Sequence, residues 1–273
     1  MGGGLSTSDS RLACGVQVKI LFIGDVIGKP GRKAVDALVP SLRQQHGIDL
    51  VIANGENAAG GIGLTPPTAE ELLGLGIDVI TSGNHIWKHR EIIPYINGDT
   101  PILRPLNFPP TVPGRGYLFT HGVLVVNLMG RVFMGESDCP FQAIDRLLAE
   151  IEPQPQITVI DFHGEATSEK NALGLYLDGR VSAVVGTHTH VGTIDARVLP
   201  KGTAFITDIG MVGPKNSVIG DDAEGVINKF LTQMPHHLSV GKGPVIFNSV
   251  LVEIGEDGRA RGITRIDLEL AKE

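Results

Sequence analysis

The sequence is poor in cysteine, in long apolar runs and in clustered basic residues, and each shortage excludes a class of protein. Its 273 residues include 2 cysteines, Cys14 and Cys139, which show neither metal-ligand nor redox-pair spacing. We interpret them as ordinary thiols of a protein in a reducing cytoplasm. No apolar stretch approaches the roughly 18 residues of a membrane span, and the N-terminus lacks the apolar core of a signal peptide. The sequence therefore predicts a cytoplasmic protein that does not bind membranes.

The charge balance limits the kind of partner. The formal net charge is −7, and no long basic run interrupts the chain. A track for duplex nucleic acid would need such a run to neutralise phosphates, so we do not expect that partner. A small anionic substrate stays compatible with the acidic balance, because bound metal cations would reverse the local field. Apolar residues make up 42% of the chain, which is enough for a sizeable core.

The chain alternates expected strands and helices after a leader. We interpret residues 1–15 as a disordered leader and residues 16–273 as a single domain. Expected strands cover residues 16–23, 49–53, 77–82, 117–120, 123–128, 157–162, 182–186, 196–199, 203–207, 245–254 and 258–268. Expected helices cover residues 30–45, a short stretch from 65, 87–95, 141–150, 168–177 and 223–233. His121-Gly122 is typical of a tight hairpin turn. This alternation predicts an α/β fold with two mixed sheets packed face to face and helices outside.

Short polar motifs follow five of the apolar runs. They are GDVIG with Asp25, NGEN with Glu56, GNH with Asn84 and His85, DFHGE with His163, and GTHTH with His188 and His190. Because strand ends of a parallel sheet lie along one edge, where such folds bind ligands, we expect these side chains to lie close together. Carboxylates, imidazoles and an amide are suitable ligands for a pair of divalent metal ions. The motifs therefore predict a metal-dependent hydrolase.

Several of these residues also have a structural interpretation. Asp25 is placed to cap the following helix, and Asn84 is a common turn residue. His163, at the end of a buried strand, is open to a capping or surface role. Glu56 is harder to explain in this way, because a lone carboxylate at the exit of a buried strand is costly unless it is paired or metal-bound. The agreement of the motifs, rather than any one of them, favours the metal site.

Other residues near the motifs are less specific. Lys29 and Arg32 follow the first motif and are candidates for substrate phosphate, although a solvated turn is the favoured interpretation. Trp87 is open to base stacking, but packing on the core is favoured. Asp161 is either a partner of a metal-binding histidine or simply the end of a strand. No role follows from the sequence for Glu165, Ser168, Glu169 and Lys170.

Together the motifs carry a family resemblance. The segments GDVIGKPGR, NGENAAGG, GNHIWKHR, DFHGEATSEK and VVGTHTHVGT resemble the YmdB-like branch of the calcineurin-like metallophosphoesterases, in order and at similar spacing. The resemblance implies a four-layer α/β/β/α sandwich over residues 16–273 and a site for two metal ions. It also implies that one metal takes Asp25, Glu56 and His190, with Asn57 assisting, and that the other takes Glu56 as a bridge with Asn84, His163 and His188. His85 would face the phosphate.

This sequence departs from the wider superfamily in the same way as the YmdB-like branch. Asp25-Val26-Ile27 lacks the histidine of the usual Asp-x-His motif, and Glu56 stands where aspartate is commoner. The first metal would therefore have fewer protein ligands. A donor set of nitrogen and oxygen without thiolate favours Mn or Fe, is compatible with Zn and suits Ca poorly.

The leading hypothesis is hydrolysis of a small phosphodiester, and the resemblance points to 2′,3′-cyclic or 3′,5′-cyclic nucleotides. The expected chemistry is in-line attack by a metal-bridging hydroxide, with His85 stabilising the equatorial oxygens or protonating the leaving group. One alternative is a phosphomonoesterase or nucleotidase, since the same site serves both reactions. Another is a regulatory binding protein that retains the metal site. Homo-oligomerisation stays open, and residues 98–115 and 215–243 would either rim the pocket or form a subunit interface.

Overall fold

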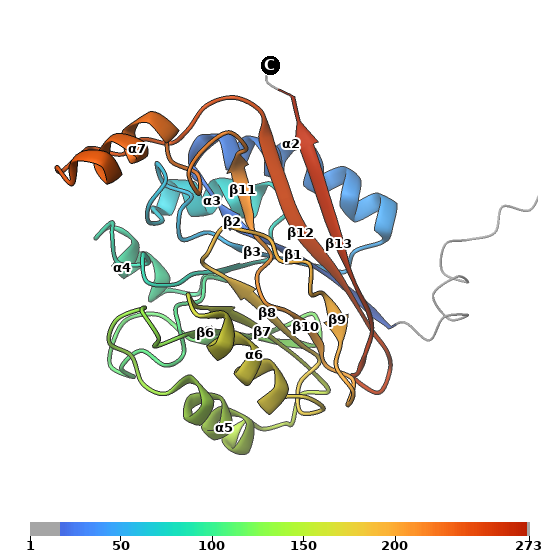
Figure 1. The fold of residues 1–273 in the computed structure, drawn as a ribbon. Coiled ribbons are helices and arrows are strands. Elements are labelled where there is room, and N and C mark those ends of the chain that lie inside the picture. Colours follow the sequence, from blue (N-terminus) through green and yellow to red (C-terminus); the bar gives the residue numbers. More distant parts are fainter. Residues whose placement is uncertain (1–16, 272–273) are drawn as a thin grey trace, which may run out of the picture.

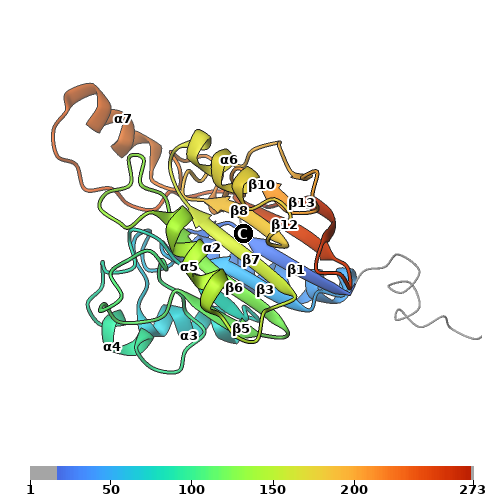
Figure 2. The same cartoon turned by 90° about the horizontal axis from the view of Figure 1, so that it is seen from below.

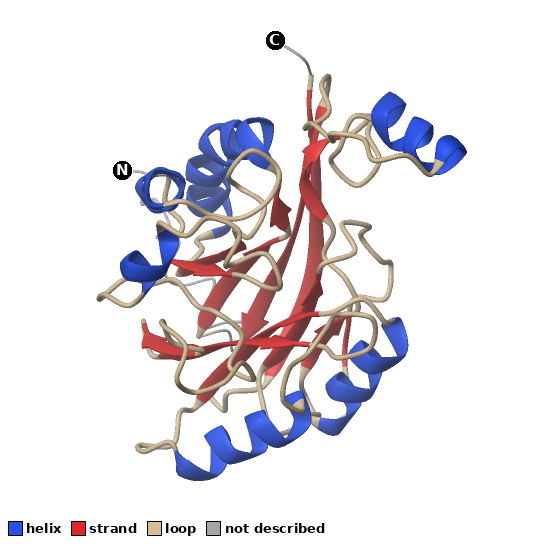
Figure 3. Cartoon of the chain, turned by 90° about the vertical axis from the view of Figure 1, so that its left-hand side faces the viewer, coloured by secondary structure: helices blue, strands red, loops and turns tan. Residues whose placement is uncertain are grey.

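A computed structural model describes residues 17–271, so the leader expected over residues 1–15 lies outside the described part. Two β-sheets pack face to face, and helices cover the outer side of each sheet (Figure 1, Figure 3). Both sheets contain parallel and antiparallel pairs. The predicted four-layer sandwich of two mixed sheets is therefore confirmed.

The first sheet has seven strands in the described chain. They are β1 (Val18–Ile23), β2 (Asp25–Val26), β3 (Leu50–Asn54), β4 (Val79–Thr81), β11 (Met211–Pro214), β12 (Val245–Ile254) and β13 (Ala260–Leu270), in the order β2-β11-β12-β1-β3-β4 with β13 on β12. Strands β1, β3 and β4 run parallel, so they end at the same edge. The loops that carry Asp25, Glu56 and Asn84 leave from that edge.

The second sheet has six strands within residues 17–271. They are β5 (Tyr117–Thr120), β6 (Val123–Met129), β7 (Ile157–His163), β8 (Ala183–Thr187), β9 (Arg197–Val198) and β10 (Ala204–Ile206), in the order β5-β6-β7-β8-β10-β9. The central strands β6, β7, β8 and β10 are parallel. His163 is the last residue of β7, and His188 and His190 follow β8 directly.

The helices form the two outer layers. They are α2 (Gly28–His46), α3 (Pro66–Gly74), α4 (Ile92–Ile96), α5 (Pro140–Glu150), α6 (Thr167–Tyr176) and α7 (Ala223–Thr232). Helices α2 and α3 share a core cluster with the first sheet, and α5 and α6 share one with the second (Figure 2). Helix α7 projects from the body (Figure 1). No helix in residues 17–271 is long and apolar enough to cross a membrane.

Alternation along the strands builds the separate cores. In β1, Ile20 and Phe22 belong to the cluster between the sheets, whereas Leu21 and Ile23 belong to the cluster under α2 and α3. Successive strand side chains point to opposite faces, so a fully apolar strand serves two cores at once. This explains why the strands read as continuous apolar runs rather than as alternating patterns.

The helix predicted over residues 87–95 is confirmed only over residues 92–95, which belong to α4. Residues 84–91 form successive turns, and only α4 is helical. The backbone N–H of His85 donates to Glu56 Oε2 at 3.0 Å, and Ile86 and Lys88 bond three residues back, to Gly83 and His85. A helix over 87–95 would place Pro94 in its interior, where proline removes a backbone hydrogen bond, whereas in α4 Pro94 lies in the first turn.

Two short strands were not predicted, whereas the hairpin was. Strands β2 and β11 pair parallel through Asp25 and Met211, so Asp25 lies within a strand rather than at a helix N-cap. Two paired residues carry no periodic signal in the sequence. The predicted hairpin turn between β5 and β6 is present, with φ of 50° at His121 and 75° at Gly122. Positive φ at both positions is typical of a two-residue type I′ turn.

Candidate metal centre

The loops after β1, β3, β4, β7 and β8 bring the candidate residues into one connected cluster. The cluster contains Asp25, Glu56, Asn57, Asn84, His85, His163, His188 and His190, each within 4 Å of another member. Asp25, Glu56, Asn57 and His163 are buried, and the others are partly exposed. A polar cluster with buried carboxylates and one open side is suited to hold cations that a substrate can reach.

One half of the cluster converges on His163. Its Nε2 lies 3.1 Å from Glu56 Oε1, 3.2 Å from Asn84 Oδ1 and 3.0 Å from His188 Nδ1. Ligand atoms of Glu56, His163 and His188 all lie within 4.8 Å of one another. These are nitrogen and oxygen donor atoms, and a single cation could interact with all of them.

The other half contains Asp25 and His190. Asp25 is 0% exposed, and its Oδ1 finds no hydrogen-bond donor in residues 17–271. His190 Nε2 lies 3.7 Å from this oxygen and 3.2 Å from Asn57 Nδ2. A buried carboxylate oxygen without a partner is costly. The unpartnered oxygen is an observation that fits a bound cation.

Groups behind the histidines set which ring nitrogen faces the cluster. Thr187 Oγ1 donates to Asp161 Oδ1 at 2.6 Å, so at 3.0 Å it accepts from His163 Nδ1 and leaves Nε2 for the cluster. His188 Nε2 lies 3.1 Å from Glu165 Oε2. His190 Nδ1 donates to the carbonyl of Ile219 at 2.6 Å. Such outer contacts orient metal-binding histidines.

Sequence reasoning left Asp161 open and missed Thr187, Glu165 and Asn54. Asp161 is 2% exposed and also accepts hydrogen bonds from Thr81 and, at 3.3 Å, from Asn54 Nδ2. It therefore supports His163 through Thr187 rather than merely ending β7. Asn54 offered one usable signal, since it is a polar residue that ends an otherwise apolar, buried strand.

The electrostatics of the metal-free cluster couple its acids and bases. Burial alone would raise the pKa of Asp25 and of Glu56, but His190 and His163 outweigh it, so the pKa of Asp25 is lowered and that of Glu56 lies well below its usual value. Burial alone would lower the pKa of His190, but Asp25 raises it to about 9. Burial and the neighbouring His163 lower the pKa of His188 to about 4. The carboxylates thus stay ionised and favour protonation of His163 and His190.

His85 lies at the edge of this cluster. Its Nδ1 is 2.9 Å from Asn57 Oδ1 and 3.3 Å from Glu56 Oε1, and its side chain is 27% exposed. Lys29 is exposed at the start of α2. Arg32 donates to Glu71 Oε2 at 2.7 Å and to the carbonyl of Ala58 at 2.5 Å. The structure thus brings His85 to the candidate centre, whereas Arg32 is bonded to α3 and to the loop after β3.

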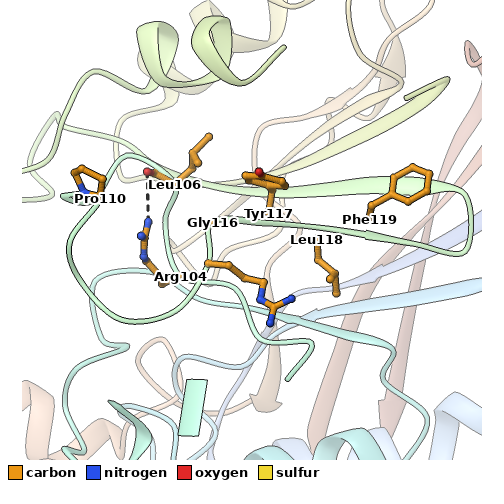
Figure 4. Close-up of a pocket in the computed structure, with 8 residues that line it drawn as sticks. Arg104, Leu106, Pro110, Gly116, Tyr117, Leu118 and Phe119 are labelled. Atoms are coloured by element: carbon orange, nitrogen blue, oxygen red, sulfur yellow. Dashed lines mark hydrogen bonds between the residues drawn. The ribbon is translucent and has the colours of Figure 1, made fainter. Parts of the chain in front are cut away.

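The structure also places Trp87 and the segments 98–115 and 215–243. The Trp87 ring packs on the core beside Phe108, with ring centroids 6.4 Å apart. Within 215–243, Ile219 contacts His190, so this segment borders the candidate centre. Within 98–115, Arg104, Leu106, Pro110 and Arg115 line a separate groove beside Tyr117, Leu118 and Phe119 of β5, with a volume of about 470 Å³ (Figure 4). That groove shares no residue with the cluster.

The chain is similar to several known proteins. It is 47% identical over 243 residues to a 2′,3′-cyclic-nucleotide 2′-phosphodiesterase from Bacillus subtilis, covering 88% of this chain and 92% of that protein. A crystal structure of a hypothetical protein from Thermus thermophilus superposes with a TM-score of 0.87 at 44% identity, covering 92% of this chain and 99% of the other. A novel phosphatase from Mycoplasma pneumoniae superposes with a TM-score of 0.88 at 33% identity, covering 94% and 95%.

The resemblance carried by the five motifs is confirmed at the level of the family. The sequence profile described as YmdB-like protein matches residues 21–266, which include every residue of the candidate centre. This match covers most of the chain. The chain therefore belongs to the YmdB-like protein family.

Proposed function

We propose that the chain is a metal-dependent phosphodiesterase that hydrolyses small phosphodiesters, with 2′,3′-cyclic nucleotides as the favoured substrates. Its class, phosphoric ester hydrolase, is supported by the names of its relatives, which include phosphodiesterases and phosphatases. The observation that carries the metal dependence is the convergence of buried Glu56, His163 and His188 beside the unpartnered Asp25 Oδ1. The 2′,3′-cyclic substrate is favoured by the relative at 47% identity.

The donor set suggests how two metals would be held. Asp25, Glu56, Asn57 and His190 would hold one, and Glu56, Asn84, His163 and His188 the other. Bound there, the metals would supply positive charge to the phosphate and lower the pKa of a water nucleophile. With nitrogen and oxygen donors, Mn or Fe is the favoured pair, and Zn is compatible.

The protein's own groups would orient the substrate and move the proton. Glu56 lies between the two halves and keeps its charge where water is excluded. The contact of His85 Nδ1 with Asn57 Oδ1 fixes one side of the ring and leaves Nε2 for the phosphate or the leaving alkoxide. Since Nδ1 donates to Asn57 Oδ1, only the doubly protonated ring carries a proton on Nε2; this imidazolium would give that proton to the leaving oxygen and remain neutral, with its proton on Nδ1.

A substrate comparison tests the proposal. Metal-stripped protein is assayed with and without added Mn²⁺ on 2′,3′-cyclic AMP, bis(p-nitrophenyl) phosphate and p-nitrophenyl phosphate. We expect Mn²⁺-dependent cleavage of both diesters and release of 3′-AMP from the cyclic nucleotide. Preference for the monoester would instead favour a phosphatase, in line with the Mycoplasma relatives. No turnover by protein that binds Mn²⁺ would favour the regulatory alternative.

A further inference from the structure

A buried ion pair outside the ligand set lies under the loop that carries His188 and His190. Lys170 of α6 and Asp208, which follows β10, are each 1% exposed, with Nζ and Oδ2 2.6 Å apart. Neither side chain is among the candidate ligands. Burying both charges has a desolvation cost that makes such a pair a weak source of stability. Its contacts indicate a different use.

The pair holds both peptide groups that flank His188. Lys170 Nζ donates to the carbonyl of Thr187 at 2.8 Å, and the backbone N–H of Thr189 donates to Asp208 Oδ2 at 3.1 Å. One charged group thus fixes the peptide before His188, and its partner fixes the peptide after it. Both bonds are made to main-chain atoms, so they constrain the backbone conformation directly and do not depend on the side chains of Thr187 and Thr189.

The backbone held in this way is one that histidine rarely adopts. His188 has φ of 103° and His190 has φ of 62°, both in the region that favours glycine. Residues in such conformations persist only when their surroundings impose them. Without the pair, we expect the loop to relax, so that His188 Nδ1 would no longer face His163 Nε2 and His190 Nε2 would no longer face Asp25.

Neighbouring residues leave room for the Lys170 side chain and hold Asp208 in place. A Cβ on Gly186 would lie 3.1 Å from Lys170 Cδ and 1.7 Å from the carbonyl oxygen of Thr207. The glycine before the Thr187–His190 segment is therefore required for the close approach of β10 and of the lysine stem. Asp208 is itself fixed, because its Oδ1 accepts from Gly210 N at 2.9 Å and its own N–H donates to Thr193 Oγ1 at 3.0 Å.

We propose that Lys170 and Asp208 are positioning residues that set the His188–His190 loop in its metal-binding conformation before any metal arrives. The expected effect on metal binding rests on the proposed function, whereas the expected effect on the conformation of the loop does not. It predicts that the loop is ordered in metal-free protein and that loss of the pair weakens metal binding without removing a ligand.

Variants that remove one or both charges test this inference. Lys170→Met leaves a buried unpaired carboxylate and is expected to lower the melting temperature strongly. Lys170→Met/Asp208→Asn removes both charges and is expected to fold, because no uncompensated ion remains. The matched control is Asp178→Asn, since Asp178 is also buried and accepts from the backbone of Lys201 and Thr203, before β10.

Two readouts are taken on each folded variant. Amide hydrogen exchange at Thr189 is measured on metal-free protein, and Mn²⁺ affinity and stoichiometry are measured by titration calorimetry. In the double variant we expect faster exchange at Thr189 and Mn²⁺ affinity lower by about 10- to 100-fold, the range found when outer contacts of a metal site are lost. Asp178→Asn is expected to lose thermal stability while both readouts stay at wild-type values.

The outcomes separate this inference from the proposed function. Wild-type Mn²⁺ affinity in the double variant, or unchanged exchange at Thr189, would overturn the positioning role. Should the double variant not fold, Lys170→Gln/Asp208→Asn, which also leaves no buried ion but keeps a polar group at each position, carries the same two readouts. If wild-type protein binds no Mn²⁺, the proposed metal site fails, and Thr189 exchange in metal-free protein still decides whether the pair holds the loop.

Discussion

At the scale of single residues, the candidate centre places ionised side chains where water is excluded. Asp25 and Glu56 are both 0% exposed, and the pKa of each carboxyl is lowered by histidines despite the opposing effect of burial. Buried charges of this kind are tolerated only when they are paired or coordinate a metal. Glu56 contacts His85 and His163, and those histidines come from two different loops.

Glu56→Gln keeps the size of this side chain and removes its charge. We expect kcat/KM for 2′,3′-cyclic AMP to fall by about 100-fold or more, because both halves of the centre would lose an anionic ligand. Steady-state kinetics at saturating Mn²⁺ measure the change, with Glu150→Gln on the exposed end of α5 as the matched control. Activity within a few-fold of wild type would argue against Glu56 as a shared ligand.

Asp195 provides a pH prediction away from the centre. Burial alone would raise the pKa of its carboxyl, but hydrogen bonds from Thr193 and Thr207 outweigh that effect and lower the pKa. A lowered folded-state pKa stabilises the protein above the unfolded value of about 4, and the contribution is lost as the pH falls below it.

Asp195→Asn should therefore be less stable than wild type by about 1 kcal/mol at pH 7, and the difference should shrink towards pH 3. Urea unfolding at a series of pH values measures it. A constant difference between pH 7 and pH 3 would show that the Asp195 charge is not responsible.

At the scale of elements, close packing between loops decides where the ligands point. A Cβ on Gly83, directly before Asn84, would lie 2.1 Å from His163 Cδ2. The loop after β4 can therefore approach the end of β7 only because this residue is glycine. The same loop also contacts Glu56, because the backbone N–H of His85 donates to Glu56 Oε2 at 3.0 Å.

Gly83→Ala should displace His163 without changing any charge. We expect a stability loss of about 1–3 kcal/mol from overpacking, together with weaker Mn²⁺ binding. Gly74→Ala in α3 is the control, since its Cβ would meet nothing within 4 Å and should stabilise the helix by about 0.5–1 kcal/mol. Thermal unfolding and Mn²⁺ titration of both variants measure the contrast. Wild-type Mn²⁺ affinity in Gly83→Ala would contradict the packing argument.

At the scale of the whole molecule, the candidate centre lies between the two sheets. Asp25, Glu56 and Asn84 follow strands of the first sheet, whereas His163, His188 and His190 come from the second. A metal bound by both groups would link the two halves of the sandwich. Ligands that bind only the folded state stabilise it by mass action.

Metal removal should therefore lower the melting temperature. Relative to EDTA-treated protein, Mn²⁺ at 100 times its dissociation constant should add about 2.7 kcal/mol to the free energy of unfolding. Differential scanning calorimetry with and without Mn²⁺ measures the shift, and Glu56→Gln should show much less of it. An equal melting temperature in both conditions would indicate that Mn²⁺ does not bind the folded chain.

The sequence by itself determined the fold class, most strands and helices, and the motifs from which the family could be stated. These are local signals, because an apolar run of strand length, a hairpin turn at His121-Gly122 or a polar motif after a strand can be read within a few residues. It also identified the eight candidate side chains that meet in the cluster, but not the contacts that Thr187, Glu165 and Asn54 make behind them, since shared strand ends bring only the motifs together.

Only the tertiary structure decided how those side chains are held. The bond from Asn54 to Asp161, which supports His163 through Thr187, and the Lys170–Asp208 pair join residues 107 and 38 positions apart, and no local pattern encodes them. Contacts between distant residues set ring orientation, backbone strain and burial, and these quantities decide what the centre can bind.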